Sequence, residues 1–548
     1  MTKGGELSGP DTEGTSDEAS DSTEAARMKQ AGVRWQHING ELEVEADTSS
    51  DEDMSPIPPT SSLDTHCVAT NCHKLPLTSG LFDYSRHLLL EVLSADELSS
   101  LKRVYTCTYK FAEFCAGTAT GTMCVEALRR AAATDGGFNL RGECVFYTEL
   151  DQWKRSVIAT MHATMPVKQL VPALMFERTG DLSKQPAHTA DGSFVDCPVC
   201  QIAFCGIVCV DVSSLSTTPK SVMDPTGKSG SSFLELMAYL RTLTFEDRPN
   251  VLILECVSSL DHQRKLAKQK KEKGTTAVIS ALSDVGYVGH WTKVCSKQFY
   301  LPHSRARVWG VFLKLKMESM GHTGRSQREL EVEQVFAFVQ RCKTPAFEPL
   351  SNVMERISWT AADVASAKAR KRRKTSATLC SIIRPSKWLQ RHMDFKAANK
   401  LELADLEAEP LLDFKEKAAV AGMGQRELEA TLLRLALMRK RGKLPDWRET
   451  ILVGNIGANV ERLQLKVESY PCLTPRMKYL LLVNGEVNKC DFASYALAIQ
   501  GIQEAEAKGF GLVHLSPAQQ QELAGNAFSA NVCVAFLLAV LVVLGPVV

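Results

Sequence analysis

The stretch from Ile202 to Leu215 constrains this chain more than any other, because it joins a buried-strand pattern directly to a thiol. It begins with an apolar run, Ile-Ala-Phe-Cys, that ends at Gly206 and is typical of a strand covered on both faces. Cys209 comes next, and a polar Asp-Val-Ser-Ser sequence lies after it. Open α/β sheets place ligands and chemistry just beyond the carboxyl ends of such strands. A single cysteine is more often a small core residue, so the choice between the two depends on the residues further along the chain.

Length and composition indicate what class of protein this cysteine belongs to. The chain has 548 residues, enough for two or three domains, and its 44% apolar and 23% charged residues are ordinary for a globular protein. The net charge of +1 hides an asymmetry, because acidic residues concentrate in residues 1–75, which we predict to be a disordered tail. The 17 cysteines, in a long chain with no secretory segment, predict free thiols in a reducing compartment.

A second group of features is typical of a nucleotide-like ligand. The strand pattern Tyr105–Phe114 meets a small-residue turn at residues 115–121, and a helical run, Met123–Ala133, follows. This arrangement lets a backbone approach a ligand at a helix N-terminus. A further strand, Glu143–Tyr147, leads to Glu149, and an acid at the end of the second strand commonly binds ribose hydroxyls. The alternative for this acid is to cap the next helix.

Two more strand ends carry polar side chains. The strand pattern Val251–Leu254 ends in Glu255. If this strand neighbours the one before Cys209, the carboxylate and the thiol share one edge of the sheet. Arg305 and Arg307 lie two residues apart on a predicted strand, so they face the same side and can both reach one anionic or polar ligand.

Other motif-like patterns do not predict a site. Two groups have a zinc-like composition: His66, Cys67, Cys72 and His73, and Cys197 with Cys200. The first spacing fits no familiar zinc finger, and the second group has no partner pair at zinc-ribbon spacing. Residues 227–229 mimic the end of a phosphate loop, but the glycine required upstream is Val222. We therefore predict no metal site and no phosphate loop of that type.

Taken in order, the motifs resemble those of the cytosine-C5 methyltransferase family, whose members use S-adenosylmethionine (AdoMet) to methylate nucleic acid. Phe204–Ser213 is similar to the catalytic motif, usually Gly-x-Pro-Cys-Gln-x-x-Ser. Residues 255–257 resemble the Glu-Asn-Val motif, and residues 302–308 resemble Pro-Gln-x-Arg-x-Arg-Val. Gln500-Gly501 and residues 525–527 are similar to the family's Leu-Gln-Gly and Gly-Asn motifs.

The resemblance implies a fold and a domain order. The expected fold is α/β, with a Rossmann-like, mixed seven-stranded sheet in a catalytic domain at residues 88–350. A smaller target-recognition region with a basic linker occupies residues 351–499, and residues 500–548 return to the catalytic domain. The implied cofactor is AdoMet. The positions implied to bind it are Cys115, Gly117, Gly121, Glu149, Leu150, Gly206 and Asn526.

The resemblance also implies roles for the catalytic residues. In the family's reaction a thiolate adds to C6 of cytosine and makes C5 nucleophilic enough to take the methyl group of AdoMet. Cys209 matches the nucleophile, and we expect its pKa to be depressed. Glu255, when protonated, would hydrogen-bond the base at N3. Arg307, and to a lesser degree Arg305, would hold the base or the adjacent backbone.

The chain departs from the family motifs at several positions. Val208 replaces the proline before the nucleophile, Cys256 replaces the asparagine that helps position that loop, and His303 replaces a glutamine. Cys115 and Ala119 replace an aromatic residue and a glycine in the cofactor turn. Because the thiol, the acid and the arginine pair are all present, we favour an active methyltransferase, with DNA preferred over RNA. The alternative is a degenerate relative that binds AdoMet or nucleic acid without catalysis.

The remaining stretches bear on partners and location. The basic cluster Ala369–Lys374 can contact phosphates or serve as a nuclear address, and the alternative is a solvated loop. We expect a nuclear protein, with the cytoplasm as the alternative, and a monomer. Arg426–Arg441 has apolar residues at helical spacing and should pack a core. Val532–Val548 is apolar but short for a membrane span, so we prefer a buried helix to a membrane anchor.

Overall fold

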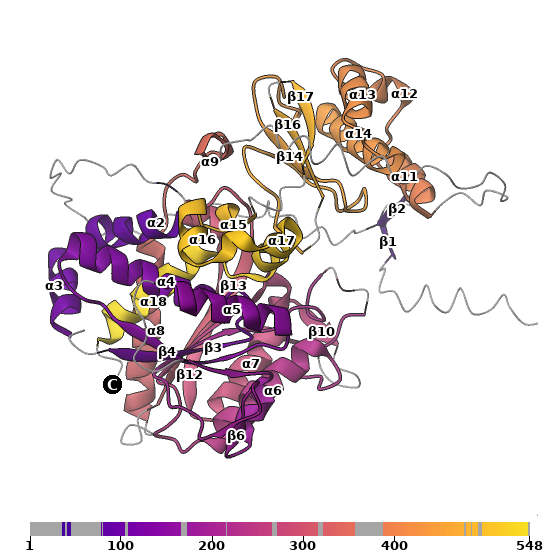
Figure 1. The fold of residues 1–548 in the computed structure, drawn as a ribbon. Helices are drawn as coiled ribbons and strands as arrows, with labels where there is room; N and C mark the ends of the chain where they lie inside the picture. Colours follow the sequence, from indigo (N-terminus) through magenta and orange to yellow (C-terminus); the bar gives the residue numbers. More distant parts are fainter. Residues whose placement is uncertain are drawn as a thin grey trace, which may run out of the picture. The chain divides into compact units, whose positions relative to one another are not determined.

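A computed structural model gives the structure of this chain (Figure 1). It describes residues 35–38, 41–44, 78, 80–104, 108–165, 173–214, 216, 218–265, 271–315, 322–356, 387–475, 478–483, 485–490 and 496–545. The chain divides into two compact units, Met1–Thr70 and Asn71–Val548, and each is described by itself.

The described part of the first unit is a pair of strands. Strands β1 (Trp35–Ile38) and β2 (Glu41–Val44) pair antiparallel, with Trp35 opposite Val44. The sequence between the strands is Asn39-Gly40, the dipeptide that most strongly favours a two-residue hairpin turn. Within the stretch that we expect to be a disordered tail, the structure describes these two strands.

The second unit is organised around a seven-stranded sheet. Its order is β12-β13-β9-β8-β3-β4-β5, and all neighbours are parallel except on the two sides of β13, which is antiparallel to both β12 and β9. The strands are β3 (Tyr109–Phe114), β4 (Gly142–Thr148), β5 (Leu174–Phe176), β8 (Ile202–Gly206), β9 (Val251–Val257), β12 (Tyr287–Cys295) and β13 (Ala306–Lys314). The predicted mixed seven-stranded sheet is confirmed.

Both faces of this sheet are buried, which explains why its central strands read as continuous apolar runs. Alternate residues enter two separate cores: Phe204 and Ile253 belong to one, and Ala203 and Leu254 to the other. The first core is completed by α4 (Thr120–Ala131), α5 (Gln152–Thr164), α8 (His322–Arg341) and α18 (Ala530–Leu544). The second is completed by α6 (Lys228–Thr242) and α7 (Gly274–Ser283).

The C-terminal segment is part of the first core. It consists of α15 (Ala496–Ile499), α16 (Glu504–Gly509), α17 (Pro517–Asn526) and α18. α18 contacts α4 and α8, and the ring of Phe536 stacks on Trp309 of β13 with centroids 5.0 Å apart. The expectation of a buried helix is confirmed, because Val532–Leu541 is almost wholly inaccessible to solvent. Among the described residues no single helix is long and apolar enough to cross a membrane, and α17 with α18 reaches that length only as a pair bent by 42°.

The core also begins earlier than the expected boundary at Leu88. Helix α2 (Leu81–His87) buries Leu81 and Tyr84 completely, and it continues through a π-helical turn (Leu88–Val92) to α3 (Ala95–Val104). The backbone N–H of Leu81 donates to the carbonyl of Gly501 at 2.7 Å. The start of α2 therefore contacts the C-terminal segment of the same chain. No local sequence pattern predicts this contact.

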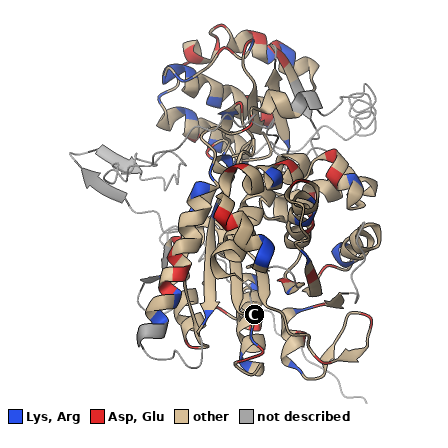
Figure 2. Cartoon of the chain, turned by 90° about the vertical axis from the view of Figure 1, so that its left-hand side faces the viewer, with Lys and Arg blue, Asp and Glu red and all other residues tan. Residues whose placement is uncertain are grey.

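The region between the sheet and the C-terminal segment has its own small core. Its helices are α11 (Lys387–Ala398), α12 (Leu403–Leu406), α13 (Leu411–Val420) and α14 (Gln425–Lys440). A four-stranded antiparallel sheet, ordered β15-β14-β16-β17, is built from β14 (Leu452–Asn455), β15 (Leu465–Val467), β16 (Tyr479–Val483) and β17 (Glu486–Cys490). The apolar face of α14 packs in this core as predicted. Basic and acidic residues both lie on its helices (Figure 2).

Short elements complete the described chain. They are β6 (Ala187–His188), β7 (Phe194–Val195), β10 (Gln263–Lys265), β11 (Lys271–Lys273), α9 (Leu350–Arg356), the π-helical turn Ala132–Gly136, and the 3-10 turns Thr179–Ser183, Ser258–Asp261, Ser296–Phe299 and Leu512–His514. The basic cluster at residues 369–374 and the cysteine–histidine group at residues 66–73 lie outside the described residues.

Candidate active site

Three neighbouring strands bring the predicted catalytic residues to one edge of the sheet. Cys209 follows the carboxyl end of β8, Glu255 lies near the carboxyl end of β9, and Arg307 lies at the start of β13, opposite Val257. β8 and β9 are parallel neighbours, which confirms the expected shared edge. Nε of Arg307 lies 3.1 Å from Oε1 of Glu255, and both side chains are largely buried. The arrangement brings a thiol, a carboxyl group and a guanidinium group together at a site that is largely shielded from solvent.

The electrostatics of the thiol differ from the prediction. The pKa of Cys209 is raised above its ordinary value, because burial disfavours the thiolate more than the nearby Arg307 and Arg305 stabilise it, and Glu255 raises it further. The expectation of a depressed pKa is therefore wrong. Burial likewise raises the pKa of Glu255, and Arg307 opposes this shift. Burial therefore makes it easier for this carboxyl group to take up a proton than for an ordinary glutamate.

Arg305 is held by the protein backbone. Its guanidinium donates to the carbonyl oxygens of Leu473 at 2.8 Å, Gly525 at 3.2 Å and Ala527 at 2.9 Å, and the residue is 4% exposed. It joins the start of β13 to the loop before β16 and to the C-terminal end of α17. Its Nη groups are thus directed at these carbonyls, whereas Arg307 remains beside Glu255.

Arg307 has a further neighbour that the sequence did not suggest. Its Nη2 lies 3.7 Å from the sulfur of Cys472, which belongs to the loop before β16. Nothing in the spacing around Cys472 distinguishes it from the other cysteines. Only the fold, which pairs Ser304 with Tyr470 through a backbone hydrogen bond of 2.9 Å, brings this loop to the site.

Two departures from the family motifs have visible consequences. The thiol of Cys256 lies 3.9 Å from the carbonyl oxygen of Ile207, so it keeps a weak link to the loop before the nucleophile. His303 is completely buried, and neither ring nitrogen has a hydrogen-bond partner among the described residues. Burial, with Arg305 and Arg307 nearby, holds the pKa of His303 well below its usual value, so the ring is neutral.

The cofactor half of the site lies at the same edge, beyond β3 and β4. Residues 115–121 form a turn in which Cys115, Gly117 and Ala119 all have positive φ values, of 53°, 55° and 53°. The carboxylate of Glu149 accepts the N–H of Gly117 at 2.8 Å and the N–H of Asp151 at 2.9 Å. One carboxylate thereby holds the turn after β3 against the loop after β4.

The predicted cofactor-binding residues differ in their exposure to solvent. Leu150 is 67% exposed, and Asn526 is exposed at the end of α17. A Cβ on Gly206 would lie 3.2 Å from the ring of Phe528 and 3.9 Å from the carbonyl oxygen of Cys115, so this glycine lies between the turn and the C-terminal segment. Gly121 is buried beneath the turn, where a Cβ would meet the ring of Phe204 at 2.9 Å.

These residues fit AdoMet. Each carboxylate oxygen of Glu149 has one backbone donor and a remaining lone pair for a ribose hydroxyl. A Cβ on Gly117 would meet only one atom, the carbonyl oxygen of Cys115 at 3.8 Å, so the backbone is open to close approach at this point. The exposed Leu150 next to the acid offers an apolar surface to a base. Gly121 supports the turn rather than facing a ligand.

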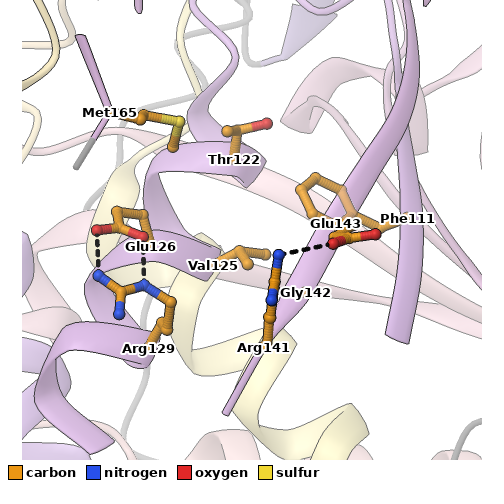
Figure 3. Close-up of a pocket in the computed structure, with 9 residues that line it drawn as sticks. All are labelled: Phe111, Thr122, Val125, Glu126, Arg129, Arg141, Gly142, Glu143 and Met165. Carbon is orange, nitrogen blue, oxygen red and sulfur yellow. Dashed lines mark hydrogen bonds and ion pairs between the residues drawn. The ribbon is translucent and has the colours of Figure 1, made fainter. Parts of the chain in front are cut away.

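A separate pocket lies on the same sheet away from this edge (Figure 3). It is lined by Phe111, Thr122, Val125, Glu126, Arg129, Arg141, Gly142, Glu143 and Met165. Its arginines are paired with its own carboxylates, Arg129 with Glu126 at 2.6 Å and Arg141 with Glu143 at 2.9 Å. Since Arg141 and Glu143 lie at the amino end of β4, the pocket is remote from Cys209.

Within the described residues, no group of three or more histidine, cysteine or acidic side chains is arranged to hold a metal ion. Cys197 of the Cys-x-x-Cys pair instead lies with its sulfur 3.8 Å from the hydroxyl of Tyr239.

Comparisons with known proteins bear on this site. A curated relative, the DNA (cytosine-5-)-methyltransferase DMT5 of Cryptococcus neoformans var. grubii, is 25% identical over 451 residues, which cover 79% of this chain. The aligned region is 17% of that relative, so the chain spans about a sixth of its length. Two solved structures are similar at low identity. The S. pombe Dnmt2 methyltransferase is 12% identical with a TM-score of 0.35, covering 79% of this chain and 98% of that one. The Entamoeba histolytica methyltransferase EhMeth is 9% identical with a TM-score of 0.36, covering 80% and 98%.

The family profile described as C-5 cytosine-specific DNA methylase matches residues 202–481. The match begins at β8, includes the strands that carry Glu255 and Arg307, and extends over just over half of the chain. On this match, the chain belongs to the C-5 cytosine-specific DNA methylase family.

Proposed function

We propose that this chain transfers a methyl group from AdoMet to C5 of cytosine in nucleic acid, DNA rather than RNA, through a covalent adduct on Cys209. The observation that carries the proposal is the meeting of Cys209, Glu255 and Arg307 at one sheet edge in a member of this family. A cytosine ring bound there would meet a nucleophile, an acid and a planar donor.

The three side chains divide the chemistry. The thiolate of Cys209 adds to C6 of the base, which splits one difficult substitution into two easier steps. Glu255, whose pKa is raised by burial, donates a hydrogen bond to N3 in its protonated form and stabilises the adduct. Arg307 orients Glu255 and lowers the pKa of the Cys209 thiol. Loss of the C5 proton and expulsion of the thiolate then restore the aromatic ring.

Substrate and cofactor would be held by different parts of the site. A base in a duplex has to leave its stack to reach a largely buried thiol, at a cost of a few kcal/mol. AdoMet, when bound, supplies the electrophilic methyl group. The turn at residues 115–121, Glu149 and Leu150 would hold it, with the Glu149 carboxylate on the ribose hydroxyls.

The proposed preference for DNA over RNA is based on how the matching family and the curated relative are described. The matching profile and the curated relative are both described as DNA enzymes, although the relative is far longer than this chain. A nuclear location is proposed on the basic cluster at residues 369–374 alone.

The test is incorporation of labelled methyl groups from AdoMet into matched DNA and RNA duplexes, with Cys209→Ala as the control. We expect label at C5 of cytosine in DNA with the native chain and none above background with the variant. AdoMet binding without incorporation into either polymer would instead establish the degenerate binding relative. Equal or greater incorporation into RNA would overturn the choice of DNA.

A further inference from the structure

The loop that carries Cys209 is tied to the start of helix α6 by a reciprocal pair of hydrogen bonds. The backbone N–H of Asp211 donates to Oγ of Ser229 at 3.0 Å, and the backbone N–H of Ser229 donates to Oδ2 of Asp211 at 2.7 Å. Ser229 is completely buried and Asp211 is 9% exposed. Both residues therefore hold this geometry largely away from water, where hydrogen bonds to a carboxylate are strong.

The carboxylate of Asp211 acts as the missing cap of α6. The helix begins at Lys228, and its N-cap residue, Gly227, has no side chain to accept a helix N–H. Asp211 accepts one of these otherwise unpaired donors, and its negative charge suits the positive end of the helix dipole. A Cβ on Gly227 would lie 2.9 Å from Oδ2 of Asp211, so the glycine leaves the space that the carboxylate fills.

This attachment fixes the loop to a rigid support. α6 buries Phe233 and Met237 in the second core, against the sheet. Asp211 lies at the centre of a single turn in which the N–H of Ser213 donates to the carbonyl of Cys209 at 2.9 Å. Movement of Asp211 away from α6 would therefore move the thiol as well.

Two further contacts hold the ends of the same loop. The N–H of Ile207 donates to the carbonyl of Glu255 at 3.0 Å, and Oγ of Ser259 donates to the carbonyl of Val212 at 2.7 Å. Only backbone groups of the loop take part in these two contacts, whereas Asp211 contributes its side chain to the contact with α6.

The departures from the family motif make this anchor significant. Val208 stands where proline usually fixes φ before the nucleophile, and Cys256 contributes only a 3.9 Å sulfur contact where an asparagine usually helps position the loop. We infer that Asp211 and Ser229 form a positioning clamp that holds Cys209 beside Glu255 and Arg307 in place of those two missing features. This inference rests on the proposed function, and it assigns Asp211 no contact with substrate or cofactor.

The test combines hydrogen exchange with kinetics on the full chain. Amide exchange is followed in peptides that cover residues 207–214, and in peptides that cover β9 as a measure of the intact fold. Asp211→Ala and Ser229→Ala remove the clamp, whereas Asp211→Asn keeps an oxygen acceptor for Ser229. Two matched controls exist: Asp224→Ala removes a carboxylate that bonds only locally to Thr226, and Ser232→Ala removes a hydroxyl that donates back to Ser229 within α6.

We expect Asp211→Ala to speed exchange in residues 207–214 by about 10- to 100-fold, the range for losing a buried hydrogen bond to a charged group. Exchange in β9 should not change. kcat for methyl transfer should fall by about 10- to 100-fold, because a misplaced nucleophile loses proximity, while the Kd for AdoMet stays constant. Asp211→Asn should recover most of the protection and rate, and both controls should match the native chain.

Several outcomes overturn the clamp. One is unchanged exchange of residues 207–214 in Asp211→Ala and Ser229→Ala; another is faster exchange with an unchanged kcat. Should Asp211→Ala unfold, as faster exchange in β9 would reveal, Ser229→Ala provides the same test with one bond lost. If the native chain transfers no methyl group and the loop still loosens only in the clamp variants, the proposed function fails while the clamp of the Cys209 loop stands.

Discussion

The two halves of the site lie along one sheet edge and are held together by different means. The cofactor half is built from residues 115–151, close in sequence, by backbone conformation and the carboxylate of Glu149. The nucleophile half gathers residues from Cys209 to Ala527 through side chains that cross between elements.

This difference decides how each half should respond to change. A local turn can lose one contact and keep its backbone conformation, because β3 and β4 hold the neighbouring parts of the chain in place. The nucleophile half depends on the largely buried ionisable side chains of Arg305, Glu255 and Arg307, and removing one partner of such a buried pair costs several kcal/mol. We expect the largest effects on the nucleophile side and the smallest in the cofactor turn.

The largest effect should follow Arg305→Met, which removes the donors that hold Leu473, Gly525 and Ala527. Because buried carbonyls would lose charged partners, we expect the free energy of unfolding to fall by about 3–5 kcal/mol. Urea denaturation followed by circular dichroism measures it. Arg248→Met is the matched control, since Arg248 also donates to two backbone carbonyls but lies far from the site. A loss no greater than that of the control would show that Arg305 is not a special link.

Arg307→Gln should lower kcat/KM for methyl transfer by about 100-fold, the usual effect of losing one electrostatic partner at a reacting centre. Its pH dependence carries more information. Arg307 lowers the pKa of Cys209, so its removal raises that pKa further above the ordinary value and reduces the thiolate fraction at neutral pH. The alkaline rise in kcat/KM should then move to higher pH. A rise at the same pH in both proteins would contradict the assigned role of Arg307.

Glu149→Ala removes the acceptor for the ribose together with the link between the turn after β3 and the loop after β4, so its effect should appear in cofactor binding. We expect AdoMet to bind about 10- to 100-fold more weakly by calorimetry, because hydrogen bonds to a carboxylate contribute about 1.5–3 kcal/mol. Asp151→Ala is the control, since Asp151 is half-exposed and pairs with Lys154 at 2.6 Å. Equal weakening by both variants would indicate a general loosening of the loop after β4.

Ala119→Gly should have the smallest effect and the opposite sign. Ala119 has a left-handed backbone conformation, φ 53° and ψ 46°, at a position where the family motif usually has glycine. Relief of that strain should stabilise the chain by about 1 kcal/mol. Ala116→Gly, outside the positive-φ set, should destabilise it slightly. A Tm decrease in Ala119→Gly would show that the turn does not carry strain at this residue.

The same contrast explains how much could be predicted from sequence. β8 and β9 are apolar runs, so their identity as strands follows from pattern, whereas the shared edge of Cys209 and Glu255 also needed the two strands to be neighbours, which the fold supplies. The bonds from Arg305 to Gly525 and Ala527 join residues that are 220 and 222 positions apart, and no local pattern predicts them. The direction of the Cys209 pKa shift was missed for a related reason, because burial by the assembled fold outweighs the nearby arginines.

The clamp between Asp211 and Ser229 could be predicted only in part from the sequence. The glycine and serine near the start of α6 were visible in the sequence as an imitation of a phosphate loop. Their use became clear only when the fold placed the Asp211 carboxylate where a cap of α6 was lacking.

The most direct test of the site is covalent trapping with DNA that contains 5-fluorocytosine, in the presence of AdoMet. Fluorine at C5 cannot leave as a proton does, so a working enzyme stays bonded to C6 of the base. Mass spectrometry of the digested complex should find the adduct on the peptide with Cys209, and Cys209→Ala should form none. An adduct on another cysteine, such as Cys472 beside Arg307, or no adduct while AdoMet binds, would contradict the assignment of Cys209 as the nucleophile.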